Sequence, residues 1–202
     1  MHPFVIAALI VCAAQPQAPA DAPPASRAAG SLKPAGPSSP AATPFAADVR
    51  GGVEALLGTR DGAISPEQWR KLGPAASPML EEIAEDSKAL STRRGRALEG
   101  LAALRSPHSP AIFTRLSQSA REPFLVRVAA MRGAGRTLSP ARQLAALKPA
   151  LERAADVRLR AVAAEVLSQH PANCAAVRAQ STREPAETQP RFEASLRRCG
   201  SK

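Results

Sequence analysis

One spacing recurs along this chain and limits how it can fold. Two sets of residues lie 33 positions apart: Arg94, Arg127 and Arg160, and Pro74, Pro107 and Pro140. The alanines that follow the arginines by three positions keep the same spacing: Ala97, Ala130 and Ala163. Two independent series with one spacing indicate an internal repeat. A period of about 20 to 50 residues is typical of arrays in which each unit buries its apolar side against the next.

The composition indicates that the repeated unit is helical. Apolar residues make up 45% of the 202-residue chain, but aromatic residues are only 3% and there is no Tyr, so Ala and Leu carry the apolar content. Ala and Leu favour helices, whereas strands are enriched in β-branched and aromatic residues. We therefore expect an all-α fold, with two helical stretches in each period and a short break of Gly, Ser or Pro between them.

Ser-Pro pairs mark where several helices should begin: Ser65-Pro66, Ser109-Pro110 and Ser139-Pro140. A serine N-cap satisfies a free backbone amide, and a proline at the first helical position has no amide to satisfy. Each serine is therefore expected to be an N-cap. Gln68 follows Ser65 by three positions, which predicts a capping box.

Two features of the helical stretches depart from a regular pattern. Pro149 lies inside the stretch that starts at Pro140, and it predicts a kink or a stop there. Gly133 and Gly135 are expected to weaken the helix that contains Met131.

The repeat resembles the HEAT-repeat family, particularly its short bacterial form. Residues 72–86 (LGPAASPMLEEIAED) look like a HEAT inner helix with its preceding Leu-Gly turn. Residues 126–135 and 156–167 look like outer helices with the family's Val-Arg and Ala-Leu pattern. The resemblance covers roughly residues 60–182 and implies a short α-solenoid of three to four helical hairpins. Ankyrin repeats share the period, but their Thr-Pro-Leu-His turn is absent.

A stack of repeats needs a cover at each end. Residues 45–58 (FAADVRGGVEALLG) are expected to form the N-terminal cover. Residues 187–199 (ETQPRFEASLRRC), in which Phe192 and Leu196 lie four apart, are expected to form a C-terminal capping helix. The predicted solenoid domain is therefore 45–202, and we expect a monomer.

The start of the chain predicts export from a bacterial cell. Residues 1–14 contain an apolar run from Phe4 to Val11 followed by small residues, which is typical of a signal peptide, with cleavage after Ala14 or as late as residue 20. Residues 15–44 are rich in Pro and Ala and predict a disordered linker. The expected location is periplasmic or secreted. Lipidation of Cys12 would anchor the protein to a membrane, and the alternative is an apolar N-terminus of a cytosolic protein.

Signal removal would leave two cysteines, Cys174 and Cys199. An even number in an exported protein predicts one disulfide. It would close a loop of about 26 residues and stabilise the protein by about 3–4 kcal/mol in the chain-entropy model. The alternative is two unpaired buried cysteines. A zinc site is not expected, because only His170 accompanies the two thiols.

Positive charge is concentrated in the middle of the chain. The formal charge is +10, and residues 87–160 hold 15 Lys or Arg against 4 Asp or Glu. Such a block attracts nucleic acid, acidic lipid or an acidic protein. In the HEAT family the periodic arginine commonly bonds to neighbouring repeats, so the resemblance implies structural roles for Arg94, Arg127 and Arg160. The non-periodic arginines are the candidates for a partner-binding patch: Arg93, Arg96, Arg115, Arg121, Arg132, Arg136 and Arg142.

The remaining polar residues do not form a recognisable catalytic, metal or cofactor motif. The acidic run Glu81, Glu82, Glu85 and Asp86 is expected to be a solvated face or to pair with arginines of the next repeat. Trp69 is expected to pack between the first two repeats. His108 and His170 lack a partner at catalytic spacing, and no phosphate-binding or metalloprotease motif occurs. We therefore expect no enzymatic activity, no metal and no cofactor.

Three functions are compatible with these features. The favoured one is an exported scaffold or adaptor that binds another protein, with acidic residues on that partner if the basic block is the contact. The alternative is a basic cytoplasmic nucleic-acid-binding repeat protein, although such proteins usually present aromatic platforms and this chain has five Phe and one Trp. The HEAT resemblance also implies a remote third function, because some HEAT-like proteins attach bilin chromophores.

Overall fold

The computed structural model describes residues 44–59 and 62–200. The expected signal peptide, Cys12 and the expected linker up to residue 43 lie outside these residues. The described helices all belong to one compact unit, Ala41–Lys202. None of them is both long and apolar enough to cross a membrane.

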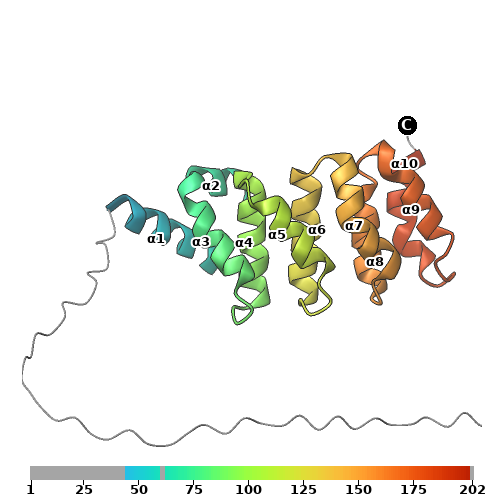
Figure 1. Cartoon of the computed structure of the whole chain (residues 1–202), viewed down its shortest axis with the longest axis horizontal. Helices are drawn as coiled ribbons and strands as arrows, with labels where there is room; N and C mark the ends of the chain where they lie inside the picture. The colour runs from blue at the N-terminus through green and yellow to red at the C-terminus, as the bar shows by residue number, and fades with distance from the viewer. Residues whose placement is uncertain (1–43, 60–61, 201–202) are drawn as a thin grey trace, which may run out of the picture. The chain divides into compact units, whose positions relative to one another are not determined.

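The described part of the chain is all-α, as expected, and contains no strand (Figure 1). Its helices are α1 (Pro44–Gly58), α2 (Pro66–Lys71), α3 (Ser77–Glu85), α4 (Ser91–Leu104), α5 (Ser109–Gln118), α6 (Phe124–Thr137), α7 (Pro140–Arg153), α8 (Val157–Leu167), α9 (Cys174–Ser181) and α10 (Glu193–Gly200). Short 3-10 helices occur at η1 (Pro74–Ala76), η2 (Pro171–Asn173) and η3 (Gln189–Phe192).

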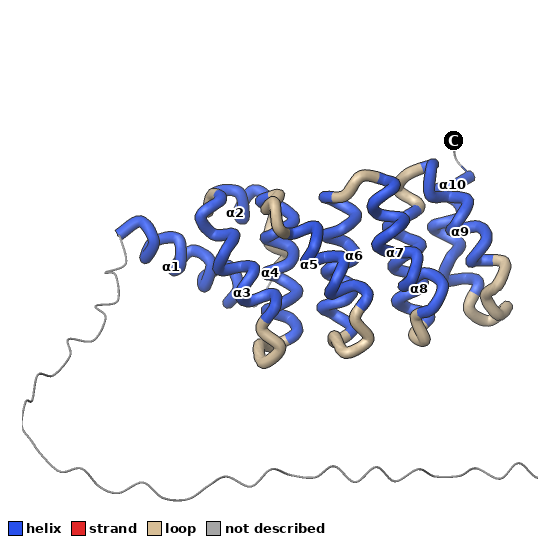
Figure 2. Tube along the Cα trace, in the orientation of Figure 1, coloured by secondary structure: helices blue, strands red, loops and turns tan. Residues whose placement is uncertain are grey.

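Successive helices pack as pairs, and the pairs pack side by side. The helix pairs α3 and α4, α5 and α6, and α7 and α8 are each joined by a short loop. One layer contains α4, α6 and α8, and the other contains α3, α5, α7 and α9 (Figure 1). The loops within the three pairs lie along the same edge, the lower edge in Figure 2. Residues one period apart therefore occupy similar places in successive pairs.

The three predicted helix starts differ in how the serine is used. At Ser65 the capping box is confirmed, because Gln68 N donates to Ser65 Oγ at 3.3 Å and Ser65 N donates to Gln68 Oε1 at 2.7 Å. Ser139 is the N-cap of α7 without a side-chain bond. The prediction for Ser109 is wrong by one residue, since His108 is the N-cap of α5. Ser109 is the first residue of α5 and is buried, and its hydroxyl donates to the Ser106 carbonyl at 2.7 Å.

Pro149 does not stop α7, which continues to Arg153. A proline inside a helix removes the hydrogen bond to the carbonyl four residues earlier, here that of Ala145. Ala145 is exposed, so water can satisfy this carbonyl. The loss of one backbone bond is therefore tolerated at this position.

The glycines in the middle of α4 and α6 allow close packing and do not interrupt the helices. Gly100 and Gly133 are one period apart. A Cβ atom on Gly100 would lie 2.9 Å from the ring of Trp69, and one on Gly133 would lie 2.5 Å from the ring of Phe113. Both aromatic side chains are fully buried against these glycines. α6 is therefore continuous across its glycines, and the expected weakening of this helix stays a prediction.

Both expected end covers are helical. In α1, Val53 and Leu57 are buried and join the core. At the other end, η3 and α10 follow one another, with Phe192 fully buried and Cys199 attached to α9 through the disulfide. A continuous apolar core extends between these two ends.

Candidate protein-binding surface

The three periodic arginines occupy the same place in their helices. Arg94, Arg127 and Arg160 are each the fourth residue of α4, α6 and α8. Each donates to a carbonyl at the end of the preceding helix: Arg94 Nε to Ala84 O (2.9 Å), Arg127 Nε to Ser117 O (3.3 Å) and Arg160 Nη1 to Ala154 O (2.7 Å). The last carbonyls of a helix have no intrahelical partner and carry partial negative charge. A guanidinium group at this place therefore ties the two helices of a pair together.

Arg94 also contacts the following helix pair. Its Nη1 lies 2.7 Å from Oε2 of Glu122, which is in the loop between α5 and α6. The Arg94 side chain is 2% exposed and that of Glu122 is 16% exposed. The ion pair thus lies in the interface between two helix pairs and is largely shielded from solvent.

Arg160 makes an equivalent contact with a different loop. Its Nε and Nη2 atoms lie 2.6 and 2.7 Å from the two carboxylate oxygens of Glu184, which follows α9. Gln180 and Thr188 also donate to this carboxylate, at 2.8 and 3.1 Å. The hydrogen bond from Arg160 lowers the pKa of Glu184 and raises the pKa of Arg160, against the opposing effect of burial.

Arg127 lacks the carboxylate that its two counterparts have. No Asp or Glu among the described residues lies within ion-pair distance of it. Asp156 instead accepts two kinds of hydrogen bond from Arg158: the backbone N–H of Arg158 donates at 2.8 Å and its guanidinium group donates at 2.7 Å. The hydrogen bond from Arg158 lowers the pKa of Asp156, and the charge of Arg127 adds a smaller effect.

The arginines of the predicted patch fall into two groups. Four of them contact other parts of the chain. Arg93 pairs with Glu54 of α1 at 2.7 Å, and Arg96 donates to the Leu57 carbonyl at the end of α1 at 2.9 Å. Arg115 pairs with Glu85, and Arg132 lies 3.9 Å from Glu165. The other three, which have no acidic partner among the described residues, are Arg121, Arg136 and Arg142.

Arg136 lines a surface hollow together with two other arginines. The hollow has a volume of about 640 Å³ and lies between α2, the end of α4 and the end of α6. Arg70 and Arg105 line it with Arg136, and all three are exposed without an acidic partner in the described chain. We call this set the three-arginine hollow. The sequence analysis missed Arg70, which lies outside the basic block of residues 87–160, and Arg105, because the sequence does not show which arginines pack beside Arg136.

Arg105 has an unusual backbone conformation. It caps the end of α4 with φ of 53°, a left-handed conformation that glycine usually provides, and its N–H donates to the Leu101 carbonyl. It is the only non-glycine residue with positive φ in the described chain. Glycine would adopt this conformation with less strain than arginine. The presence of arginine here therefore favours a role for its guanidinium group.

Arg115 and Arg142 are brought together in a groove between α5 and α7. The groove has a volume of about 680 Å³, and small or apolar side chains line most of it. These include Pro110, Ala111, Leu138, Ala145 and Ala146. Gln118 also lines the groove and donates to the Ala146 carbonyl at 3.0 Å. Of the predicted patch, Arg115 and Arg142 line this groove and Arg136 lines the three-arginine hollow, so the structure does not gather the patch at one place.

The acidic run lies in α3 and at its C-cap, and three of its four residues form bonds within the chain. Glu85 pairs with Arg115 of the next helix pair, which is one of the two arrangements expected for this run. Glu81 accepts a hydrogen bond from Ser106 at 2.5 Å and faces His108 at 3.3 Å. Asp86 accepts from the backbone N–H of Lys88 at 2.9 Å in a turn. Within the described residues, no group of three His, Cys, Asp or Glu side chains is placed to hold a metal ion.

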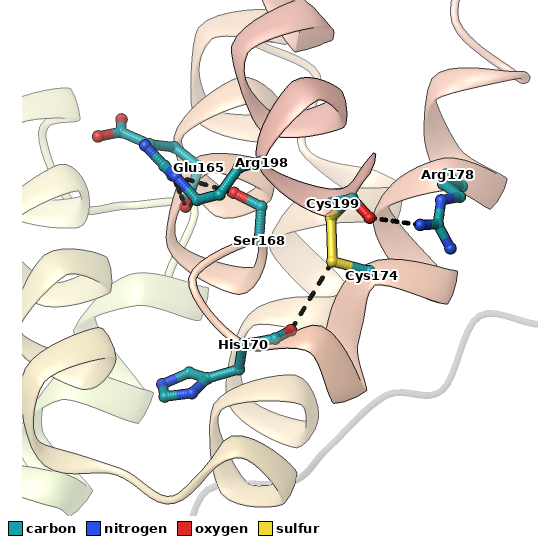
Figure 3. The surroundings of a disulfide bond; sticks show 7 residues. All are labelled: Glu165, Ser168, His170, Cys174, Arg178, Arg198 and Cys199. Carbon is teal, nitrogen blue, oxygen red and sulfur yellow. Dashed lines mark hydrogen bonds between the residues drawn. A yellow bond between two sulfur atoms is a disulfide. The ribbon is translucent and has the colours of Figure 1, made fainter. Parts of the chain in front are cut away.

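The predicted disulfide between Cys174 and Cys199 is confirmed (Figure 3). It joins α9 to α10 with a Cα–Cα distance of 5.5 Å, which is typical of a disulfide. Arg178 donates to the Cys199 carbonyl at 2.6 Å, and Arg198 donates to the Glu165 carbonyl at 3.0 Å and to Ser168 Oγ at 3.1 Å. The last helix is therefore attached to both α9 and α8.

Comparison with models of protein families, with curated proteins and with solved structures finds no match for this chain. The function must therefore be argued from the surface itself.

Proposed function

We propose that this chain is an exported, non-enzymatic adaptor that binds an acidic partner protein. In this proposal its helix pairs form a short α-solenoid of HEAT-like hairpins, capped by α1 and α10. Two features support the solenoid: the side-by-side packing of the pairs and the equal placement of the periodic arginines. Stacked helix pairs present an extended surface, which repeat proteins use to bind other proteins.

The observation that carries the proposed function is the three-arginine hollow. Arg70, Arg105 and Arg136 come from three separate segments and line one concave surface, which no acidic residue of the described chain lines. Like charges gathered in a hollow repel one another and create a positive potential that an anionic ligand relieves. Acidic side chains of a partner protein would be attracted to this surface and oriented by it.

The exposed surface favours a protein partner over nucleic acid. Single-stranded nucleic acid is commonly bound by stacking of bases on aromatic side chains. Trp69, Phe113 and Phe192 are fully buried, and Phe124 is half-buried beneath the guanidinium group of Arg158. The part of the surface that the structure describes therefore offers charge without an exposed stacking platform.

The test is capture of partners by the full-length protein from an extract of its native host. A variant with Arg70, Arg105 and Arg136 changed to Gln should lose its captured acidic protein. A control variant with Lys88, Arg183 and Arg191 changed to Gln loses the same charge from other exposed positions and should retain it. Raising the salt concentration should weaken capture by the wild type. Equal capture by both variants, or capture that is insensitive to salt, would contradict the proposed contact.

The location is tested on the same protein. Intact-mass measurement of the protein purified from its native host should show removal of residues 1–14 or up to residue 20, and a mass lower by two hydrogens for the disulfide. Retention of the N-terminal residues would favour the cytoplasmic alternative, and an added lipid mass on Cys12 would show anchoring.

A further inference from the structure

We propose a second recognition site, in which Arg127 and Arg153 bind the carboxylate of a glutamate side chain supplied by a partner protein. This inference rests on the proposed function, because it requires a protein partner, but it concerns a site distinct from the three-arginine hollow. It follows from comparing three equivalent places within the one chain.

Arg94 has an ion pair and Arg127 does not, and this difference corresponds to a single residue in the adjoining loop. Glu122 immediately precedes the N-cap of α6, and from there its carboxylate reaches Arg94 of the preceding helix pair. The residue that immediately precedes the N-cap of α8 is Ala155, exactly one period after Glu122 in the sequence. An alanine has no carboxylate to offer, so Arg127 lacks the ion pair that Arg94 has.

A cavity is found where the missing carboxylate would lie. It has a volume of about 480 Å³, and Arg127, Arg153 and Ala155 line it together with Asp156. Ala120, Pro149 and Ala150 also line it and provide small apolar surfaces. The cavity is therefore large enough for a side chain, and two arginine residues line it.

The charges in this cavity favour an added anion. Arg127 uses its Nε for the Ser117 carbonyl, and neither it nor Arg153 has an ion pair among the described residues. Asp156 is the only acidic residue that lines the cavity, and its carboxylate already accepts three hydrogen bonds within 3.1 Å from the Arg158 side chain. Two guanidinium groups with free N–H donors can bind a carboxylate through charge-assisted hydrogen bonds.

The rest of the protein indicates that the anion is a glutamate carboxylate. Both equivalent arginines, Arg94 and Arg160, are paired with a glutamate. Gln118 lines both this cavity and the apolar groove between α5 and α7.

Binding of a fluorescent oligoglutamate peptide to the full-length protein tests this site. Arg153→Gln removes one charge-assisted donor from an exposed side chain and should weaken binding about tenfold. Arg183→Gln, the control, should leave it unchanged. Ala155→Glu supplies the carboxylate from within the chain and should weaken binding by at least as much. Ala155→Gln has the same size without the charge and should retain more binding than Ala155→Glu.

The outcomes separate this site from the adaptor function. If the Arg153 and Ala155 variants bind the peptide as the wild type does, and only the three-arginine hollow variant loses it, the Arg127 site is wrong and the adaptor proposal stands. Equal loss in Ala155→Gln and Ala155→Glu would show obstruction and not carboxylate recognition. Inorganic phosphate that displaces the peptide more effectively than acetate at equal ionic strength would overturn the assignment of a carboxylate. If no protein is captured from the host extract, the adaptor function fails independently of the peptide result.

Discussion

The arginines at the start of α6 and α8 are one period apart but have different surroundings. Arg160 binds both oxygens of Glu184, whose side chain is 1% exposed and which follows an α9 that a disulfide joins to α10. Arg127 has only the Ser117 carbonyl and lines a cavity. The comparison teaches that a repeat position is structural or available for binding according to the residues of the adjoining loop, and not according to the repeated residue itself.

The largest expected effect concerns the disulfide at the C-terminal end. Changing Cys174 and Cys199 to Ser should lower the free energy of unfolding by about 3.5 kcal/mol, because the unfolded chain regains the freedom of a closed loop. Urea denaturation followed by circular dichroism measures this. Wild-type protein in a reductant should match the double variant, and a variant as stable as the oxidised wild type would show that the disulfide does not stabilise this end.

The next effect compares the two acidic residues. Glu184→Gln should lower the free energy of unfolding by about 2–3 kcal/mol, since it weakens a buried pair that has three donors. Asp156→Asn is the matched change in the middle of the chain, where the carboxylate is exposed to solvent on one side and Asn can still cap α8. Asp156→Asn should therefore lower the free energy of unfolding by much less than Glu184→Gln does. Equal losses in the two variants would remove the contrast between a closed and an open site.

The pH dependence of stability should report the same contrast. Because the pKa of Glu184 is lowered in the folded protein from an ordinary value of 4.5, its contribution is present above that value and is lost as the pH falls below it. Denaturation at a series of pH values should show a smaller acid-induced loss for Glu184→Gln than for the wild type. An unchanged profile in the variant would mean that the Arg160 pair contributes little.

The sequence predicted the arrangement of helices better than it predicted the surface. The 33-residue spacing and the Ala-rich composition were sufficient for an all-α fold, because burial of one side of each helix is a periodic property that the sequence displays directly. The expected weakening of α6 stays a prediction, because helix propensity contains no information on the Phe113 ring packed against Gly133. The disulfide was predictable from two cysteines in a chain expected to be exported.

The contacts of the arginines were less predictable. Arg70, Arg105 and Arg136 are distant in sequence, and only the packing of α2, α4 and α6 brings them to one hollow. The pairing of Glu184 with Arg160 was also missed, because Glu184 lies in the loop after α9, at a position that the 33-residue spacing does not mark. The replacement of Glu122 by Ala155 one period later is visible in the sequence, but its meaning depends on the ion pair of Arg94.

The central claim is that Arg127 lies in a site that lacks only a carboxylate. A double-mutant cycle tests it most directly, with Ala155→Glu and Ala155→Gln each measured in the wild-type background and with Arg127→Met. The free energy of unfolding should show that Glu at 155 is more favourable than Gln by about 1 kcal/mol when Arg127 is present, and that this preference disappears with Met. The claim would be contradicted if Glu at 155 were no more favourable than Gln when Arg127 is present. It would also be contradicted if the preference for Glu were the same in the Arg127→Met background.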